Sequence, residues 1–230
     1  MVRRKKQSKV SNVRHLITKL NPRSPITEQY KTIRTNLQFS SVDGDLKTML
    51  VTSSGPSEGK SSTTANLAIV FAQQGKKVLL IDADMRKPTL HYTFRMDNRR
   101  GLSSVLVGES ILEESASSSD VEGLDLLSCG PIPPNPSELL GSRAMENMIG
   151  RAKEEYDIIL FDTPPVLAVT DAQILANICD GAVMVVRSNQ TENDAAIKAK
   201  ELLEVGNAKL LGVVLNDREQ NKAHYYYYGN

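Results

Sequence analysis

Short apolar runs rich in Val, Ile and Leu alternate with amphipathic segments along most of the chain. Such runs are typical of strands that helices cover on both faces. We expect strands at 48–52, 77–82, 124–128, 157–162, 182–187 and 210–216. Apolar residues at helical spacing predict helices at 61–74, 137–154, 171–178 and 193–204, and a further helix that Thr27 caps at its N-terminus. The alternation predicts a single α/β domain with a mostly parallel β-sheet and helices on both faces.

The two ends of the chain lack this pattern. Residues 1–27 contain Pro22 and Pro25 and show no hydrophobic periodicity, so we expect a flexible arm before a folded domain over 28–217. Residues 218–230 are polar and then rich in tyrosine, and we expect a mobile tail there.

Charge is divided unevenly between the arm and the rest of the chain. The arm holds eight Lys/Arg residues and no acid, whereas the whole chain carries +1, which leaves −7 on the other residues. A basic arm is either a solvated tail or a segment attracted to the anionic inner surface of a membrane. No aromatic or Gly-rich recognition element accompanies it, so we expect no nucleic-acid partner.

Other classes of protein are excluded by the apolar runs and the cysteines. The runs fall far short of the ~20 residues of a membrane span, and no apolar h-region follows the basic N-terminus. Cys129 and Cys179 stand far apart without a second pair, which argues against a disulfide framework or a zinc site. We therefore expect a soluble, cytoplasmic protein.

The most specific motif follows the first expected strand. Residues 54–61 read Ser-Gly-Pro-Ser-Glu-Gly-Lys-Ser, a phosphate loop between a strand and a helix, with Ser54 where the motif usually begins with Gly. Its backbone N–H groups and the helix N-terminus would surround the β-phosphate of a nucleotide. Lys60 would bridge the β- and γ-oxygens, and Ser61 would help to hold Mg²⁺. The motif predicts the P-loop NTPase fold.

Carboxylates stand at the ends of two further expected strands. Asp82 and Asp84 follow one apolar run, and Asp162 ends another. Because the carboxyl ends of parallel strands face the ligand crevice, we expect these side chains beside the phosphate loop, where a divalent cation would neutralise them.

These motifs resemble those of a known family. Asp82-x-Asp84-x-Arg86 resembles the second Walker A-type motif of bacterial tyrosine kinases, both the CpsD/CapB type and the cytoplasmic domain of Wzc-like proteins. Asp162 in Phe-Asp-Thr-Pro-Pro resembles their Walker B segment, and segments 69–78 and 130–136 are also similar to that family. The resemblance covers roughly residues 25–228.

The resemblance implies ATP-dependent protein-tyrosine phosphorylation in the control of capsular or exopolysaccharide production. It implies that Ser61, Asp82 and Asp162 hold Mg²⁺ and that Asp84 lies beside the attacking phenol; whether Asp82 or Asp84 takes the phenol proton stays open. The implied catalytic set is Lys60, Asp82, Asp84 and Arg86. The expected nucleotide-binding set is Gly55, Ser57, Glu58, Gly59, Lys60, Ser61, Ser62 and Asn216, the last as a recogniser of adenine.

Four of the seven tyrosines stand near the C-terminus, at Tyr225, Tyr226, Tyr227 and Tyr228. In the family such a cluster is the autophosphorylation substrate, presented to the active site of the neighbouring subunit in a homo-oligomeric ring. A flexible segment of about a dozen residues spans on the order of 20 Å, enough to reach a neighbouring site. A docking segment or an interaction patch is the alternative interpretation.

The chain departs from the family at two places. Ser57 stands where members usually have Gly, which strains the loop if this position needs a positive φ. Glu28, Lys31 and Arg34 share a helix face and resemble the Glu-x-x-Arg-x-x-Arg helix of the ring contact, with Lys31 replacing the first Arg. Lysine lacks the guanidinium fork, so the contact would be weaker; a solvated face is the alternative.

The resemblance also implies partners. These are a transmembrane adaptor of the polysaccharide co-polymerase class that recruits the kinase to the inner face of the membrane, other proteins phosphorylated on tyrosine, and a cognate phosphotyrosine phosphatase. Phe39 and Ser40 are candidates for the adaptor contact, whereas Thr170 and Asp171 are expected only to cap a helix.

Two other functions fit a phosphate loop. A switch ATPase of the ParA/MinD kind carries an additional lysine where this chain has Gly55, which argues against it. A scaffold that binds ATP without transferring phosphate stays open because of Ser57. An iron–sulfur carrier of related fold would need paired cysteines, and the sequence has none.

Overall fold

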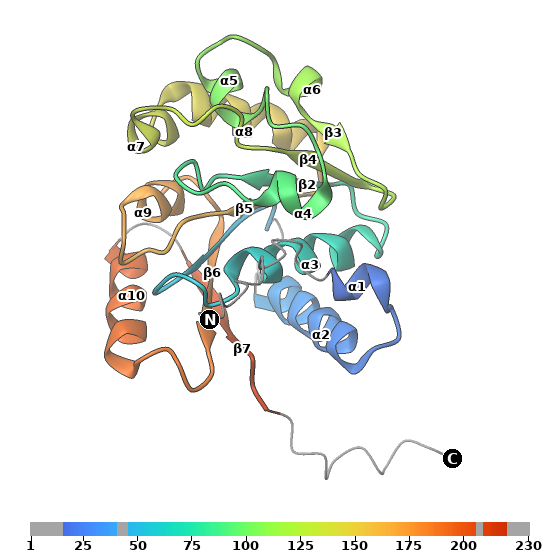
Figure 1. Cartoon of the computed structure of the whole chain (residues 1–230), viewed down its shortest axis with the longest axis vertical. Coiled ribbons are helices and arrows are strands. Elements are labelled where there is room, and N and C mark those ends of the chain that lie inside the picture. Colours follow the sequence, from blue (N-terminus) through green and yellow to red (C-terminus); the bar gives the residue numbers. More distant parts are fainter. Residues whose placement is uncertain (1–15, 41–45, 206–208, 220–230) are drawn as a thin grey trace, which may run out of the picture.

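The computed structural model describes residues 16–40, 46–205 and 209–219 (Figure 1). In this part of the chain the strands are β1 (Thr48–Ser53), β2 (Val78–Asp82), β3 (Ser117–Ser118), β4 (Leu124–Leu127), β5 (Ile158–Asp162), β6 (Gly181–Arg187) and β7 (Leu210–Asn216). The helices are α1 (Ile17–Leu20), α2 (Pro25–Ser40), α3 (Lys60–Ala72), α4 (Leu90–Phe94), α5 (Leu102–Leu106), α6 (Leu112–Ser115), α7 (Pro136–Leu140), α8 (Arg143–Glu155), α9 (Asp171–Ala176) and α10 (Asn193–Val205).

The strands form one sheet in the order β3-β4-β2-β5-β1-β6-β7. The short β3 pairs antiparallel with β4, and the other neighbours are parallel. β1 therefore lies between β5 and β6, so the loop that follows β1 emerges at the same edge as the carboxyl ends of β2 and β5. The expected α/β fold with a mostly parallel sheet is confirmed.

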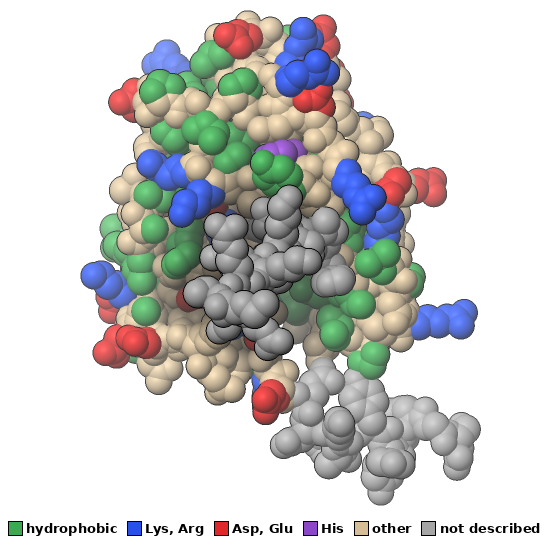
Figure 2. Space-filling view, in the orientation of Figure 1, with side chains coloured by type: hydrophobic (Ala, Val, Ile, Leu, Met, Phe, Trp, Pro, Cys, Tyr) green, Lys and Arg blue, Asp and Glu red, His purple; other side chains and the backbone are tan. Residues whose placement is uncertain are grey.

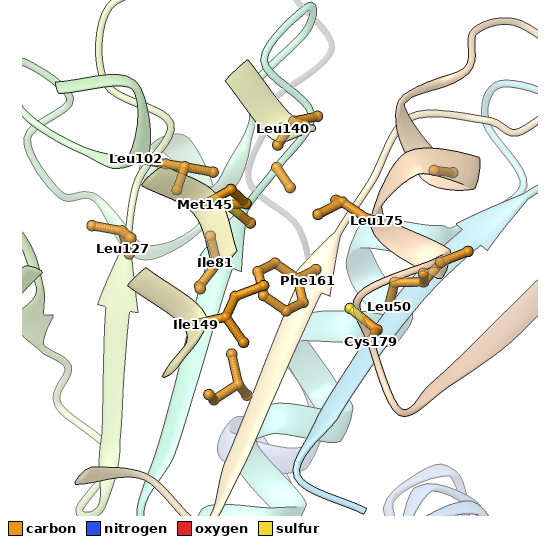
Figure 3. Close-up of a cluster of buried hydrophobic side chains, with 14 of the residues drawn as sticks. Leu50, Ile81, Leu102, Leu127, Leu140, Met145, Ile149, Phe161, Leu175 and Cys179 are labelled. Carbon is orange, nitrogen blue, oxygen red and sulfur yellow. The ribbon is translucent and has the colours of Figure 1, made fainter. Parts of the chain in front are cut away.

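Helices cover both faces of the sheet (Figure 1). The first face packs on α8 and α9, and in Figure 3 the Phe161 ring of β5 lies beside Ile149 of α8 and Ile81 of β2. The second face packs on α2 and α3 through residues such as Leu80 and Phe71. Burial on both sides explains why the inner strands are continuous apolar runs.

The surface is charged with both signs. Around the rim of the face shown in Figure 2, Lys and Arg side chains are interspersed with Asp and Glu side chains. No helix among residues 16–40, 46–205 and 209–219 is both long and apolar enough to cross a membrane.

The N-terminal boundary differs from the expected one. Residues 16–27 are folded and do not belong to a flexible arm: α1 packs on α3, where Thr18 is fully buried and its N–H and hydroxyl both donate to Asn66 Oδ1. Helix α2 begins before Thr27, and Ser24 Oγ accepts from the Thr27 N–H at 3.1 Å, so Ser24 and not Thr27 caps it. Residues 1–15 lie outside the described part.

The helix expected over 137–154 is two helices. α7 ends at Leu140, and α8 begins after Ser142, whose hydroxyl accepts a hydrogen bond from the Met145 N–H. A side-chain cap of this kind starts a new helix. Gly141, which lies between the two helices, has a low helix propensity and favours the end of the first one.

Candidate active site

The phosphate loop connects β1 to the first turn of α3, as the sequence predicts. Two of its residues have left-handed backbone: Gly59 at φ 96°, directly before the helix, and Ser57 at φ 65°. An L-residue in this region is destabilised by about 1–2 kcal/mol, whereas glycine is not. Ser57 therefore holds a strained conformation that glycine would hold freely.

The Glu58 side chain accepts hydrogen bonds that stabilise the phosphate loop. Its buried carboxylate accepts hydrogen bonds from the Ser54 N–H at 3.1 Å, the Ser54 hydroxyl at 2.6 Å and the Thr191 hydroxyl at 2.9 Å. Ser54, the departure at the start of the motif, thus links the beginning of the loop to its end. Thr191 follows β6, so the same carboxylate also anchors the loop to a neighbouring strand.

The Lys60 ammonium lies among the expected carboxylates. Its Nζ is 3.0 Å from Asp84 Oδ2, 3.5 Å from Asp162 Oδ1 and 3.2 Å from Ser61 Oγ. Burial alone would lower the pKa of Lys60, but the charges of Asp162 and Asp84 outweigh it and hold the pKa above its usual value. The lysine is therefore a fixed positive charge at the mouth of the phosphate loop.

Asp82 and Asp162 are direct register partners on the adjacent parallel strands β2 and β5. Asp82 Oδ2 accepts from the backbone N–H groups of Thr89 and Leu90, at 2.9 and 2.8 Å. Burial, together with the nearby charges of Asp162 and Asp84, raises the pKa of Asp82 to about 7 despite those two hydrogen bonds. Asp82 is therefore poised between its acid and carboxylate forms near neutral pH.

Buried carboxylate oxygens without hydrogen-bond partners mark the place that a cation would fill. Asp82 Oδ1 and both oxygens of Asp162 are buried and accept no hydrogen bond from the described residues. Native proteins rarely leave such atoms unsatisfied, and carboxylate oxygens are the ligands that Mg²⁺ prefers. The described residues contain no group of three or more His, Cys, Asp or Glu side chains arranged to hold a metal ion. A Mg²⁺ ion that completed its shell with phosphate and water would fit these atoms.

Arg86 is held by a residue expected only to cap a helix. Its Nε and Nη2 donate to the two oxygens of Asp171, each at 3.0 Å, and Nη2 also donates to Ser137 Oγ at 3.1 Å. Ser137 Oγ in turn donates to Asp171 Oδ1. The expected capping pair is wrong, since Thr170 makes no side-chain cap bond and the Asp171 carboxylate binds Arg86.

Asn216, at the end of β7, contacts the loop. Its Nδ2 donates to the Glu58 carbonyl at 3.0 Å and lies where a Cβ on Gly59 would be, at 2.1 Å. The remaining expected loop residues lie here too: Gly55 O accepts from the Ser53 hydroxyl, and Ser62 O accepts from the Asn66 side chain. The structure therefore brings the residues expected to bind the nucleotide to one edge of the sheet.

The expected ring-contact residues lie on α2 but do not act as one ion-pair set. Lys31 Nζ pairs with Glu28 Oε1 at 2.7 Å within the helix. Arg34 instead turns onto α3, where Nη1 donates to the Val70 carbonyl at 2.8 Å. Cations near a helix C-terminus are stabilising, so Arg34 has a role within the subunit. The oligomer contact stays a prediction, and Tyr225–Tyr228 lie outside the described residues.

The sequence pattern does not indicate four residues of this site: Ser137, Asp171, Thr191, and Arg187, whose Nη1 donates to the Ser57 carbonyl. Each acts through a partner far away in sequence, such as Asp171 through Arg86. A polar residue at or near the end of a strand, or at the start of a helix, was the available signal, and capping produces the same signal.

Comparisons with known proteins agree on one kind of protein. The AAA domain family matches residues 46–204. The chain is similar to tyrosine-protein kinase YwqD of Bacillus subtilis, 52% identical over 217 residues that cover 94% of this chain and 92% of that protein. It is also similar to tyrosine-protein kinase CpsD of Streptococcus agalactiae, 38% identical with 93% of each chain covered. The crystal structure of the chimerical protein CapA2B2 matches with a TM-score of 0.86 and 46% identity, covering 89% of this chain and 90% of that one.

Proposed function

The chain belongs to the bacterial tyrosine kinases of the CpsD/CapB type, and from this premise we propose that it transfers the γ-phosphoryl group of ATP to the tyrosines of its own C-terminal cluster and to other proteins. As a member it is a tyrosine-protein kinase that regulates capsule or exopolysaccharide biosynthesis. The observation that carries the proposal is the position of Lys60 Nζ, which lies between Asp84 and Asp162 at the first turn of α3.

ATP would bind with its phosphates on the loop 54–61. The first N–H groups of α3 have no partner within the helix and attract anions, and Lys60 adds a full positive charge beside them. Asn216 supports adenine recognition at the same edge, because its Oδ1 is an acceptor suited to the exocyclic amine while its Nδ2 holds the loop. Ser61, Asp82 and Asp162 would hold Mg²⁺, which when bound would spread the charge of the γ-phosphoryl group.

The residues of the chain have simple tasks in this reaction. Lys60 orients the transferred group and neutralises part of its charge, so that most of the rate enhancement comes from positioning and electrostatics. As the phenol oxygen forms its bond to phosphorus and the bond to the ADP oxygen breaks, the phenol proton passes to a carboxylate. Asp84 and Asp82 are both candidates, and Arg86 would hold the loop that carries Asp84.

The acceptor tyrosines are Tyr225, Tyr226, Tyr227 and Tyr228, which follow β7 after a short polar stretch. We expect them to reach the active site of a second copy in a ring built partly on Glu28, Lys31 and Arg34. Phosphorylation adds about −1.5 to −2 charges per tyrosine, and this charge would drive the tail from the carboxylates of the site and loosen the ring.

A separate activator completes the proposal. The likeness to the chimerical protein CapA2B2 supports an activator of the CapA kind, which we expect to be a transmembrane adaptor of the polysaccharide co-polymerase class. Such an adaptor would bring the kinase to the inner face of the membrane, where the basic residues of 1–15 would meet anionic lipid. Phe39, which is 78% exposed at the end of α2, is a candidate contact. A phosphotyrosine phosphatase would reverse the modification.

The test is a phosphorylation assay on the purified chain with Mg·ATP and the cytosolic segment of an adaptor. We expect phosphotyrosine on the four tail tyrosines, no label in Lys60→Met, and full label in the control Lys77→Met, whose ammonium pairs with Glu155 at the opposite end of the sheet. Tail label at the full level in Lys60→Met would show the kinase assignment to be wrong. ATP hydrolysis without label would favour a switch ATPase, and binding with neither would favour a scaffold.

A further inference from the structure

Two side chains at the ends of neighbouring strands donate hydrogen bonds to backbone carbonyls of the phosphate loop. Arg187, the last residue of β6, donates from Nη1 to the Ser57 carbonyl at 3.4 Å. Asn216, the last residue of β7, donates to the Glu58 carbonyl at 3.0 Å. These two carbonyls belong to consecutive peptide groups within the strained part of the loop.

Holding a carbonyl also fixes the N–H of the same peptide. The described chain contains no cis peptide bond, and in a trans peptide the C=O and N–H point in opposite directions. With the Ser57 carbonyl turned to Arg187, the Glu58 N–H points away from Arg187, and the Gly59 N–H likewise points away from Asn216. Loop N–H groups are what a phosphate loop offers its ligand, so these side chains set the direction of its donors.

Asp217 holds the Arg187 side chain, and Thr191 holds its backbone. Its Nε and Nη2 both donate to Asp217 Oδ2, at 3.0 and 2.8 Å, and its backbone N–H donates to Thr191 Oγ1 at 2.8 Å. The same Thr191 hydroxyl donates to Glu58 Oε1. The guanidinium is therefore held by Asp217 where it reaches the Ser57 carbonyl, and the Arg187 backbone is linked through Thr191 to the Glu58 carboxylate.

The strained backbone of Ser57 explains why these hydrogen bonds to the loop are needed. Serine prefers a negative φ, so a loop with Ser57 at φ 65° relaxes toward another conformation unless something holds its peptide. We infer that Arg187 is a positioning residue for the phosphate loop, which keeps the Ser57 peptide in the left-handed conformation that nucleotide binding requires. The inference rests on the proposed nucleotide site and adds to it a residue that touches neither phosphate nor substrate.

A double-mutant cycle between Arg187 and Ser57 tests the inference. The probe is Mg·ADP, and its dissociation constant is measured for the full chain and for Arg187→Ala, Ser57→Gly and the double variant. We expect Arg187→Ala to weaken Mg·ADP about tenfold, and the same change in the Ser57→Gly background to weaken it about twofold, because glycine needs no support at positive φ. In the kinase assay the loss appears as a raised KM for ATP with little change in kcat.

Controls separate positioning from general damage. Arg99→Ala removes an arginine that pairs with a nearby aspartate away from the loop, and it should leave the affinity for Mg·ADP unchanged. Arg187→Lys keeps a donor and the charge without the fork, and its affinity should fall between those of the wild type and Arg187→Ala.

Two results would overturn the inference: an unchanged affinity in Arg187→Ala, or an equal loss in the wild-type and Ser57→Gly backgrounds. If Arg187→Ala does not fold, the comparison of Arg187→Lys in the two backgrounds decides in the same way. A wild-type chain that binds no Mg·ADP contradicts the proposed nucleotide site as well, whereas wild-type binding that Arg187→Ala leaves intact contradicts this inference alone.

Discussion

Arg86 and Asp171 form a bidentate ion pair in which each carboxylate oxygen accepts one hydrogen bond from the guanidinium at 3.0 Å. The two partners differ in their surroundings, since the Asp171 side chain is fully buried and that of Arg86 is 40% exposed. The pair joins the loop after β2, which carries Asp84, to the N-terminus of α9. Bidentate geometry of this kind fixes the orientation of both side chains more firmly than a single hydrogen bond does.

The unequal burial predicts unequal effects of removing each partner. Arg86→Ala leaves a buried carboxylate with only the Ser137 hydroxyl, and we expect a loss of about 2 kcal/mol in the free energy of unfolding. Asp171→Ala leaves a guanidinium that water can reach, and should cost less. Urea denaturation of both variants measures the difference. A double variant less stable than Arg86→Ala would contradict this account, because removing both partners removes the orphaned charge.

Ser57→Gly should raise the free energy of unfolding by about 0.5–1 kcal/mol. Glycine removes the penalty that serine has in the left-handed region of the folded state. Glycine also raises the conformational entropy of the unfolded chain, which offsets part of that gain in stability. The matched control is Asn189→Gly at φ 58°, where asparagine already tolerates the left-handed region and the gain should be smaller. Equal gains at both positions would show that Ser57 carries no special strain.

Gly59→Ala should abolish nucleotide binding. The new Cβ would meet the Asn216 amide and displace it from the Glu58 carbonyl, in addition to the penalty of φ 96°. Gly75→Ala is the matched control, since Gly75 also has a positive φ, at 85°, but nothing lies within 4 Å of its added Cβ. Gly75→Ala should lose about 1 kcal/mol of stability, and Gly59→Ala should lose more, because its Cβ also displaces Asn216. Only Gly59→Ala should lose affinity in a nucleotide titration, and loss in both would point to a general effect of backbone strain.

Asp82 predicts a pH dependence of stability in the nucleotide-free chain. Its pKa is raised to about 7 in the fold, so the folded state keeps a proton that the unfolded state has lost above about pH 4. The stabilisation from this group is complete below the unfolded pKa and is lost as the pH rises through 7. Asp82→Asn cannot titrate, so its unfolding free energy should fall less between about pH 4 and about pH 7 than that of the wild type. Parallel pH profiles would show that Asp82 is already ionised in the fold.

The same carboxyl group predicts the pH dependence of metal binding. Mg²⁺ needs the carboxylate form, so the affinity for Mg·ADP should fall as the pH drops below the Asp82 pKa of about 7. A titration in two buffers, at about pH 8 and about pH 6, measures the effect. In Asp82→Asn the affinity should be low and should depend less on pH over this range than that of the wild type.

Periodicity located the strands well because it reflects burial on both faces. The strand expected at 210–216 has those bounds, and the other expected strands differ by a residue at one end. The helices were less certain, since one side-chain cap at Ser142 divides a continuous amphipathic pattern into α7 and α8. Helix α1 was missed because four residues are too few to show a helical period.

The site was predictable where its parts are consecutive in sequence or end a strand. The phosphate loop, Asp82 and Asp162 meet those conditions, and parallel topology alone brings them together. Asp171 meets neither condition, and Arg187 ends a strand but was not predicted, because both act through contacts with residues of other elements that the sequence pattern does not show. The sequence pattern also does not predict the φ angle of Ser57, since this angle follows from the conformation of the folded loop and not from the residue at that position.

The position of β7 has a mechanical consequence. The strand lies at the edge of the sheet and runs parallel to β6, and the chain that leaves it begins with Asp217, which Arg187 binds. Capture of the tail tyrosines by a second molecule would place the tail under tension. This tension would act first on the Arg187–Asp217 ion pair and then, along the strand direction, on the hydrogen bonds between β6 and β7. Because Arg187 and Asn216 also touch the phosphate loop, tension on the tail would be felt at the nucleotide.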